Sequence, residues 1–229
     1  MQLTVPGVQD YVATESYSYD ALHRLVDNTR SNAPDVYYGY DSLGNFTSKS
    51  DYGVLYRYDD EKPNAVSEID LVGGGSVKYG YDANGNRTHE NGVQTVWYNA
   101  VNKPILIKRL GTELHFSYAA NHMRFKQTDK NKGIDTFYID KVYELTKSGE
   151  GHKEKLYVGD VAVITIDKDL EGTNDYSLAF LHNDRLGSPT AYFNELGEIL
   201  TIQNFGPFGK PRDGMNNDLT IPVMENNDL

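Results

Sequence analysis

The sequence predicts an all-β chain, organised as an array of antiparallel β-hairpins that together form a curved sheet. Two observations carry this prediction: a Tyr-Asp pair recurs along the chain, and the apolar residues before each pair alternate with a period of two. The composition agrees, because the 229 residues include 18 tyrosines and 21 glycines but only 8 prolines. Tyrosine suits half-buried strands, and glycine suits tight turns. No segment has a convincing helical pattern.

The Tyr-Asp pair marks one end of each repeat. The clear copies are Tyr19-Asp20, Tyr40-Asp41, Tyr58-Asp59 and Tyr81-Asp82. Weaker copies follow at Tyr98, Tyr118, Tyr138 and Tyr157, and successive tyrosines in the whole series lie 17 to 23 residues apart. Two strands of about six residues with their two turns need about 20 residues. Each repeat is therefore predicted to be one hairpin.

The residues before each pair indicate how the hairpin is built. Val36, Tyr38 and Tyr40 are spaced by two, and the pattern recurs in the later copies. Residues with this spacing share one face of a strand. The tyrosine thus closes an apolar stripe where the strand ends, and the aspartate begins the turn, where its side chain can accept backbone N–H groups. We expect Tyr40, Tyr58 and Tyr81 to be buried against neighbouring repeats.

Composition and charge exclude several functions. The net charge of −11 and the pI of about 4.9 disfavour binding to a phosphate backbone, so no nucleic-acid partner is expected. The absence of cysteine excludes a disulfide framework and a thiolate metal site. No apolar run approaches the roughly 18 residues of a membrane-spanning helix, so no membrane span is predicted.

Two groups of residues deserve a chemical interpretation, and both are better explained structurally. His182 and Asp184 would share a strand face as an acid–base pair, but no third partner has a suitable spacing. The run from Asp167 to Asp175 resembles a calcium-binding loop, but Leu178 stands where the bidentate carboxylate is required. A solvated acidic hairpin tip is the preferred interpretation. The sequence predicts no catalytic residue, no cofactor and no metal site, and hence no enzyme.

A longer, ordered series of motifs occupies the C-terminal third. It comprises residues 181–189, 194–198 and 205–212, and its motif positions are His182, Asp184, Gly187, Ser188, Pro207, Gly209 and Arg212. With the Tyr-Asp pairs, this series resembles the YD repeats and repeat-associated core of the Rhs family, which occurs in bacterial polymorphic toxins, the C components of toxin complexes and teneurins. The resemblance covers residues 17–212.

The chain departs from the family pattern at two points. Phe205-Gly206 stands where the family usually has Tyr-Asp, so the carboxylate of that position is missing. The complete core also ends in an Asp-Pro-containing stretch that supports self-cleavage, and this chain contains no Asp-Pro dipeptide. An autoproteolytic enzyme is therefore less favoured than the two non-enzymatic functions, a shell segment and a surface recognition module.

The resemblance implies a segment of an Rhs-type β-shell that encloses a C-terminal effector or toxin domain, in a secreted or cell-surface bacterial protein. The expected partners are flanking parts of a longer parent chain, the effector domain, and a second chain bound through unpaired edge strands. The alternative is a surface recognition module for glycans or a partner protein. Four parts are expected: a lead-in strand (1–18), the hairpin array (19–160), a core-like segment (161–212) and a polar, flexible tail (213–229).

Overall fold

The computed structural model describes residues 2–4, 12–31, 33–172 and 174–213. Every regular element in these residues is a strand and none is a helix, which confirms the all-β prediction. The strands are β1 (Gln2–Thr4), β2 (Val12–Tyr19), β3 (Leu25–Arg30), β4 (Ala33–Tyr40), β5 (Phe46–Lys49), β6 (Gly53–Tyr58), β7 (Val66–Leu71), β8 (Ser76–Tyr81), β9 (Arg87–Glu90), β10 (Gln94–Tyr98), β11 (Pro104–Arg109), β12 (Thr112–Tyr118), β13 (Arg124–Asp129), β14 (Ile134–Ile139), β15 (Tyr143–Ser148), β16 (Gly151–Val158), β17 (Ala162–Asp169), β18 (Asn174–Asn183), β19 (Pro189–Phe193), β20 (Ile199–Phe205) and β21 (Pro211–Asp213). None of the described segments is a helix long and apolar enough to cross a membrane.

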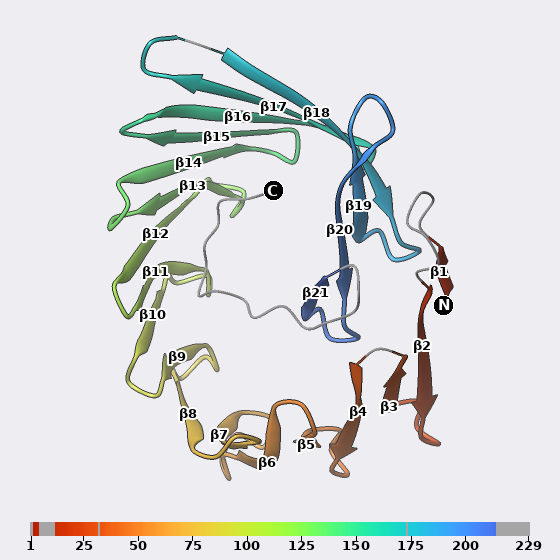
Figure 1. Cartoon of the computed structure of the whole chain (residues 1–229). Coiled ribbons are helices and arrows are strands. Elements are labelled where there is room, and N and C mark those ends of the chain that lie inside the picture. Colours follow the sequence, from red (N-terminus) through yellow and green to blue (C-terminus); the bar gives the residue numbers. More distant parts are fainter. Residues whose placement is uncertain (1, 5–11, 32, 173, 214–229) are drawn as a thin grey trace.

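The strands form one sheet with a meander topology. Each strand pairs antiparallel with the strand that precedes it and the strand that follows it in the chain. Figure 1 shows this single layer curving round so that β21 lies inside the curve, near β4. The hairpin array is therefore confirmed. The division into four parts stays a prediction, and residues 214–229 of the expected tail lie outside the described residues.

The aspartate of each Tyr-Asp pair organises the turn that follows it. In the clearest copy, Oδ1 of Asp82 accepts the backbone N–H groups of Asn84 and Asn86, both at 2.9 Å. Gly85 between them has a φ of 83°, a backbone conformation that a side chain disfavours. The side chain of Asn86 also donates to Asp82, and this bond lowers the pKa of the Asp82 carboxyl group. The aspartate is thus a fixed part of the turn.

The tyrosine of each pair ties its hairpin to the preceding one. Its hydroxyl donates to the carbonyl oxygen of the first strand residue after the previous Tyr-Asp turn. Such bonds run from Tyr40 to Leu25 (2.9 Å), from Tyr58 to Phe46 (2.8 Å), from Tyr81 to Val66 (2.9 Å), from Tyr98 to Arg87 (2.9 Å) and from Tyr118 to Pro104 (2.7 Å). A register shift immediately before each of these tyrosines accompanies the contact. Tyr40, Tyr58 and Tyr81 are partly buried.

The core is a stripe along the sheet rather than a central cluster. All but one of its buried apolar side chains lie on the concave face, which is the side of the sheet where Tyr38 contacts Phe208 and Leu114 lines a cavity. They are Val36, Tyr38, Ile69, Val77, Val96 and Leu114, and the exception is Ala162 on the other face. The register places them in continuous rows from strand to strand, as between Ile69 and Val77. Each hairpin therefore contributes a few apolar residues and depends on its neighbours to bury them.

The bond from Tyr81 to Val66 leads to the first prediction. Tyr81→Phe removes the hydroxyl but keeps the ring, so we expect the free energy of unfolding to fall by about 1 kcal/mol, as for loss of one hydrogen bond. Denaturant unfolding followed by circular dichroism measures this change. Tyr19→Phe is the matched control, because Tyr19 occupies the same motif position in the first repeat and is 59% exposed. Equal effects of the two substitutions would contradict the role of the hydroxyl.

Candidate functional site

The first core-like motif forms a turn of the same design as the Tyr-Asp turns. Oδ1 of Asp184 accepts the N–H groups of Leu186 (2.8 Å) and Ser188 (2.9 Å), and Gly187 has a φ of 84°. His182 has a different partner, since its Nδ1 lies 3.3 Å from Oγ1 of the buried Thr190. The aspartate and the histidine are thus engaged separately, and the structure does not bring them together as an acid–base pair.

The third core-like motif, residues 205–212, closes the curve. Arg212 is only 3% exposed, although it lies in the last described strand. Its guanidinium forms an ion pair with Glu15 of β2 and donates to Oδ1 of the fully buried Asn28 of β3 at 3.2 Å. A Cβ atom at Gly206 would lie 3.0 Å from Nη2 of Arg212. The glycine that replaces the family's aspartate therefore leaves room for the guanidinium.

Two further side chains of the same hairpin contact the N-terminal strands. The ring of Phe208 packs against Tyr38 of β4 and edge-on against Phe46 of β5, with 5.2 Å between ring centroids in both cases. Nζ of Lys210 lies 3.6 Å from the carboxylate of Asp51. We call Phe208, Lys210 and Arg212 the clasp. It holds the last hairpin on the concave face of β2–β5.

The remaining motif positions shape the clasp hairpin. Gly206 donates its N–H to the carbonyl oxygen of Lys210, and Gly209 donates to that of Gly206, both at 2.8 Å. Gly209 has a φ of 77°, and the exposed Pro207 precedes Phe208 in the turn. The Tyr-Asp turn geometry is thus retained without the aspartate side chain. Phe208, the third residue of this turn, directs its ring towards β4 and β5.

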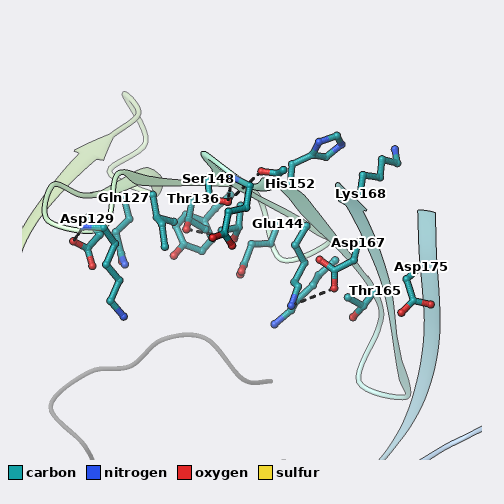
Figure 2. A pocket seen from close by; sticks show the side chains of 18 of the residues that line it. Gln127, Asp129, Thr136, Glu144, Ser148, His152, Thr165, Asp167, Lys168 and Asp175 are labelled. Carbon is teal, nitrogen blue, oxygen red and sulfur yellow. Dashed lines mark hydrogen bonds and ion pairs between the residues drawn. The ribbon is translucent and has the colours of Figure 1, made fainter. Parts of the chain in front are cut away.

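A polar wall lines the concave face farther along the sheet. A cavity of about 1420 Å³ lies against β12–β18 and extends to Leu200 and Thr201 of β20. Figure 2 shows Thr136, Glu144, Thr165 and Asp167 on one side of the sheet, with His152 and Lys168 on the other. Because the carboxylate of Asp167 lies 3.3 Å from Nζ of Lys153, part of the charge on this wall is compensated locally.

The acidic residues of the wall are not arranged as a metal site. Asp167 and Asp175 of the calcium-like run are direct neighbours across β17 and β18. Oδ1 of Asp175 accepts the backbone N–H of Tyr176 at 2.9 Å, and Asp167 faces Lys153. Within the described part of the chain, no three metal-ligating side chains form a group. The arrangement provides a surface on which charges are paired locally.

The sequence did not predict several residues that form the clasp or contact it. Glu15, Asn28 and Asp51 belong to no repeated motif, and nothing in their local sequence distinguishes them. Phe208 lies within the core-like series, but the alternation of apolar residues gives no reason to place it against β4 and β5. The signal that could have indicated a special role for Phe208 is its large aromatic side chain at a turn position.

The buried guanidinium generates a second prediction. Arg212→Met removes the positive charge that compensates Glu15 and the donor that satisfies Asn28, so we expect a loss of roughly 3–5 kcal/mol in the free energy of unfolding. The measurement is a denaturant titration of the purified chain. Arg185→Met is the control, because Arg185 is an exposed residue of the Asp184 turn. If both variants were equally stable, the ion pair would contribute nothing to closure.

Two tyrosines, the buried Tyr38 and the partly buried Tyr56, generate a third prediction. Burial raises the pKa of Tyr38 to about 12 and that of Tyr56 to about 12. Because the folded pKa exceeds the unfolded value of about 10, the stabilisation is complete below pH ~10 and is lost as the pH rises towards 12. Unfolding titrations between pH 9 and pH 12 should show falling stability, with a shallower slope in Tyr38→Phe. An unchanged slope in that variant would contradict the assignment.

Comparison with known proteins agrees with this architecture. No family model matches the chain, and no curated protein matches its sequence. Solved structures do match: the TcdB2-TccC3 crystal structure has a TM-score of 0.60 at 14% identity, covering 91% of this chain and 14% of that one. The TcdB2-TccC3-TEV crystal structure gives 0.58 at 14% identity, with 89% and 14% covered. The Photorhabdus luminescens Tc holotoxin pore, with a TccC3-D651A mutation, gives 0.55 at 14% identity, with 86% and 13% covered.

These matches concern the fold. This chain spans about one seventh of the length of the toxin-complex chains it matches. At 14% identity, the shared feature is the path of the curved hairpin sheet. The resemblance to toxin-complex members of the YD-repeat proteins, inferred above from the Tyr-Asp pairs and the core-like motifs, is thereby confirmed at the level of the fold.

Proposed function

We propose that this chain is a non-catalytic wall segment of a protein shell, and that the shell encloses an effector polypeptide in a secreted bacterial toxin. The observation that carries the proposal is the cavity of about 1420 Å³ on the concave side of β12–β18. A curved single-layer sheet creates an inside and an outside, and the clasp determines how far the sheet turns. The likeness to toxin-complex structures supports the toxin context.

The chemistry of the concave wall suits a container. An apolar wall would bind the exposed apolar side chains of an incompletely folded polypeptide and retain them, because burial of apolar surface is favourable. Here the lining mixes a few apolar side chains, such as Leu114, with threonines such as Thr136 and Thr165 and charged side chains such as Lys153 and Asp167. Such side chains keep their water and give a contained chain few strong attachment points. The polar part of the wall therefore suits the enclosure of a polypeptide more than its tight binding.

The proposal is tested by comparing the two faces of the sheet in the complete reading frame that contains this chain. These 229 residues contain no cysteine, so a thiol introduced here is a single reporter once any cysteine elsewhere in the reading frame has been replaced by serine. Lys153→Cys places it on the concave wall and Lys108→Cys places it on the convex face. The two lysine side chains are matched, being 41% and 49% exposed and each paired with one carboxylate.

We expect a small maleimide to label both variants. A bulky polymer-linked maleimide should label Lys108→Cys at least tenfold faster than Lys153→Cys, because a closed shell excludes the large reagent. Unfolding in denaturant should abolish the difference. Equal labelling of both faces by the bulky reagent would show an open sheet, which would fit the alternative function of a surface recognition module and overturn the shell.

A further inference from the structure

A smaller cavity with an apolar floor lies on the concave side of β16–β20, beside the larger one. Its volume is about 470 Å³. The register places Tyr157, Val163 and Ala179 in one row across β16–β18, and Leu181 and Tyr192 in the next row. All five side chains line the cavity and are only partly buried. Because apolar surface left in water is unfavourable, an apolar occupant would be stabilised here.

The last described strand leads towards this cavity. β21 pairs antiparallel with the end of β20, with Asp213 opposite Gln203 (Figure 1). Continuation of the same ladder would carry the next residues back along β20, past Leu200 and Thr201, which both line the cavity. Among the described residues, no strand pairs with that stretch of the β20 edge. Such an edge can accept an extended segment through main-chain hydrogen bonds.

The sequence that follows β21 contains one apolar run in a polar tail. Residues 214–229 are rich in Asn and Asp, but residues 219–224 read LTIPVM. The proline in this run favours extended backbone at the residue before it. Alternate side chains of an extended segment point the same way, so Leu219, Ile221 and Val223 would share one side. The run is therefore suited to cover an apolar floor.

The charges around the cavity and around the run are complementary. Asp218 precedes the run and Glu225 follows it, and the tail contains no Lys or Arg. The cavity lining carries Lys141 and Lys155 against one carboxylate, that of Asp160. Lys141 lies in the turn before β15 and is exposed. An acidic apolar segment thus fits this border better than a basic one.

The connection is long enough to reach. Leu219 follows Asp213 by six residues, which span up to about 20 Å when extended. Strands in a sheet lie about 4.8 Å apart, so the distance across the sheet from β20 to β17 is roughly 14 Å. The run can therefore lie over the whole apolar floor without any change in the clasp.

We propose that residues 219–224 dock in the apolar cavity of β16–β20, with Leu219, Ile221 and Val223 directed onto its floor. The end of this chain then covers apolar side chains of β16–β19, as the clasp covers aromatic side chains of β4 and β5. A docked segment takes the place of the flexible tail that the polar composition predicts. This docking requires neither a closed shell nor an enclosed effector.

A pair of introduced thiols tests the contact in the full chain, which contains no other cysteine. Ala179→Cys places one thiol on the cavity floor, and Ile221→Cys places the other in the docked run. Oxidised glutathione should link the two within one molecule, at a rate that does not depend on protein concentration. The matched control combines Ile221→Cys with Leu178→Cys, because Leu178 is the next residue of β18, is also partly buried, and lies on the opposite face. This control pair should link at least tenfold more slowly, as measured by mass spectrometry.

Hydrogen exchange tests the docking without cysteines. The amides of residues 219–224 should exchange at least tenfold more slowly in the unmodified chain than in Ile221→Asp, which places a charge against the apolar floor and leaves the sheet unaltered. Asn227→Asp is the control, since it introduces the same side chain outside the run, and it should exchange like the unmodified chain. Exchange of residues 219–224 at the rate of an unfolded peptide would overturn the proposal. So would equal rates of disulfide formation in the two cysteine pairs, or slow exchange that Ile221→Asp leaves unchanged.

Discussion

The fold depends on the bond between each hairpin and the one before it. A two-stranded hairpin is at best marginally stable in water, and among the described residues no second layer packs along the whole length of the sheet. The tyrosine hydroxyl of one repeat therefore donates to the backbone of the preceding repeat, as Tyr58 does to Phe46. The same tyrosine buries its ring along the concave stripe. One residue type thus supplies both the packing and the directional contact that keep successive hairpins in register.

The clasp solves a different problem, which is how a repeat array ends. Terminal repeats expose the face that an internal repeat would bury, and many repeat proteins cover it with a special cap. Here the cap comes from the far end of the chain, because Phe208 and Arg212 pack on strands near the N-terminus. The contacts between the clasp and β2–β5 thus involve both ends of the array and take the place of two separate caps. The curvature and the stability of the N-terminal hairpins are consequently linked to the same few side chains.

The sequence predicted what is local and missed what is distant. The spacing of Val77, Tyr79 and Tyr81 has a single explanation in a strand, and the aspartate of each pair explains its turn, so the hairpins followed from short-range patterns. The ion pair between Glu15 and Arg212 joins residues 197 positions apart. It depends on curvature summed over the entire sheet, which no local pattern contains. The polar residues of the concave wall could not be predicted either. The alternation of polar and apolar residues shows that the two faces of a strand differ, but it does not say which face lies inside the curve.

The strictly sequential pairing of the strands has a consequence for how the chain is made. Every backbone ladder joins neighbours in the sequence, so each hairpin can form as soon as its own residues have left the ribosome, without waiting for distant segments. The clasp is the exception. Its residues are synthesised long after β4 and β5, whose aromatic side chains they cover. Tyr38 and Phe46 therefore remain uncovered while most of this chain is translated. Closure of the curve is therefore a late event, which occurs only after nearly the whole sheet has been synthesised.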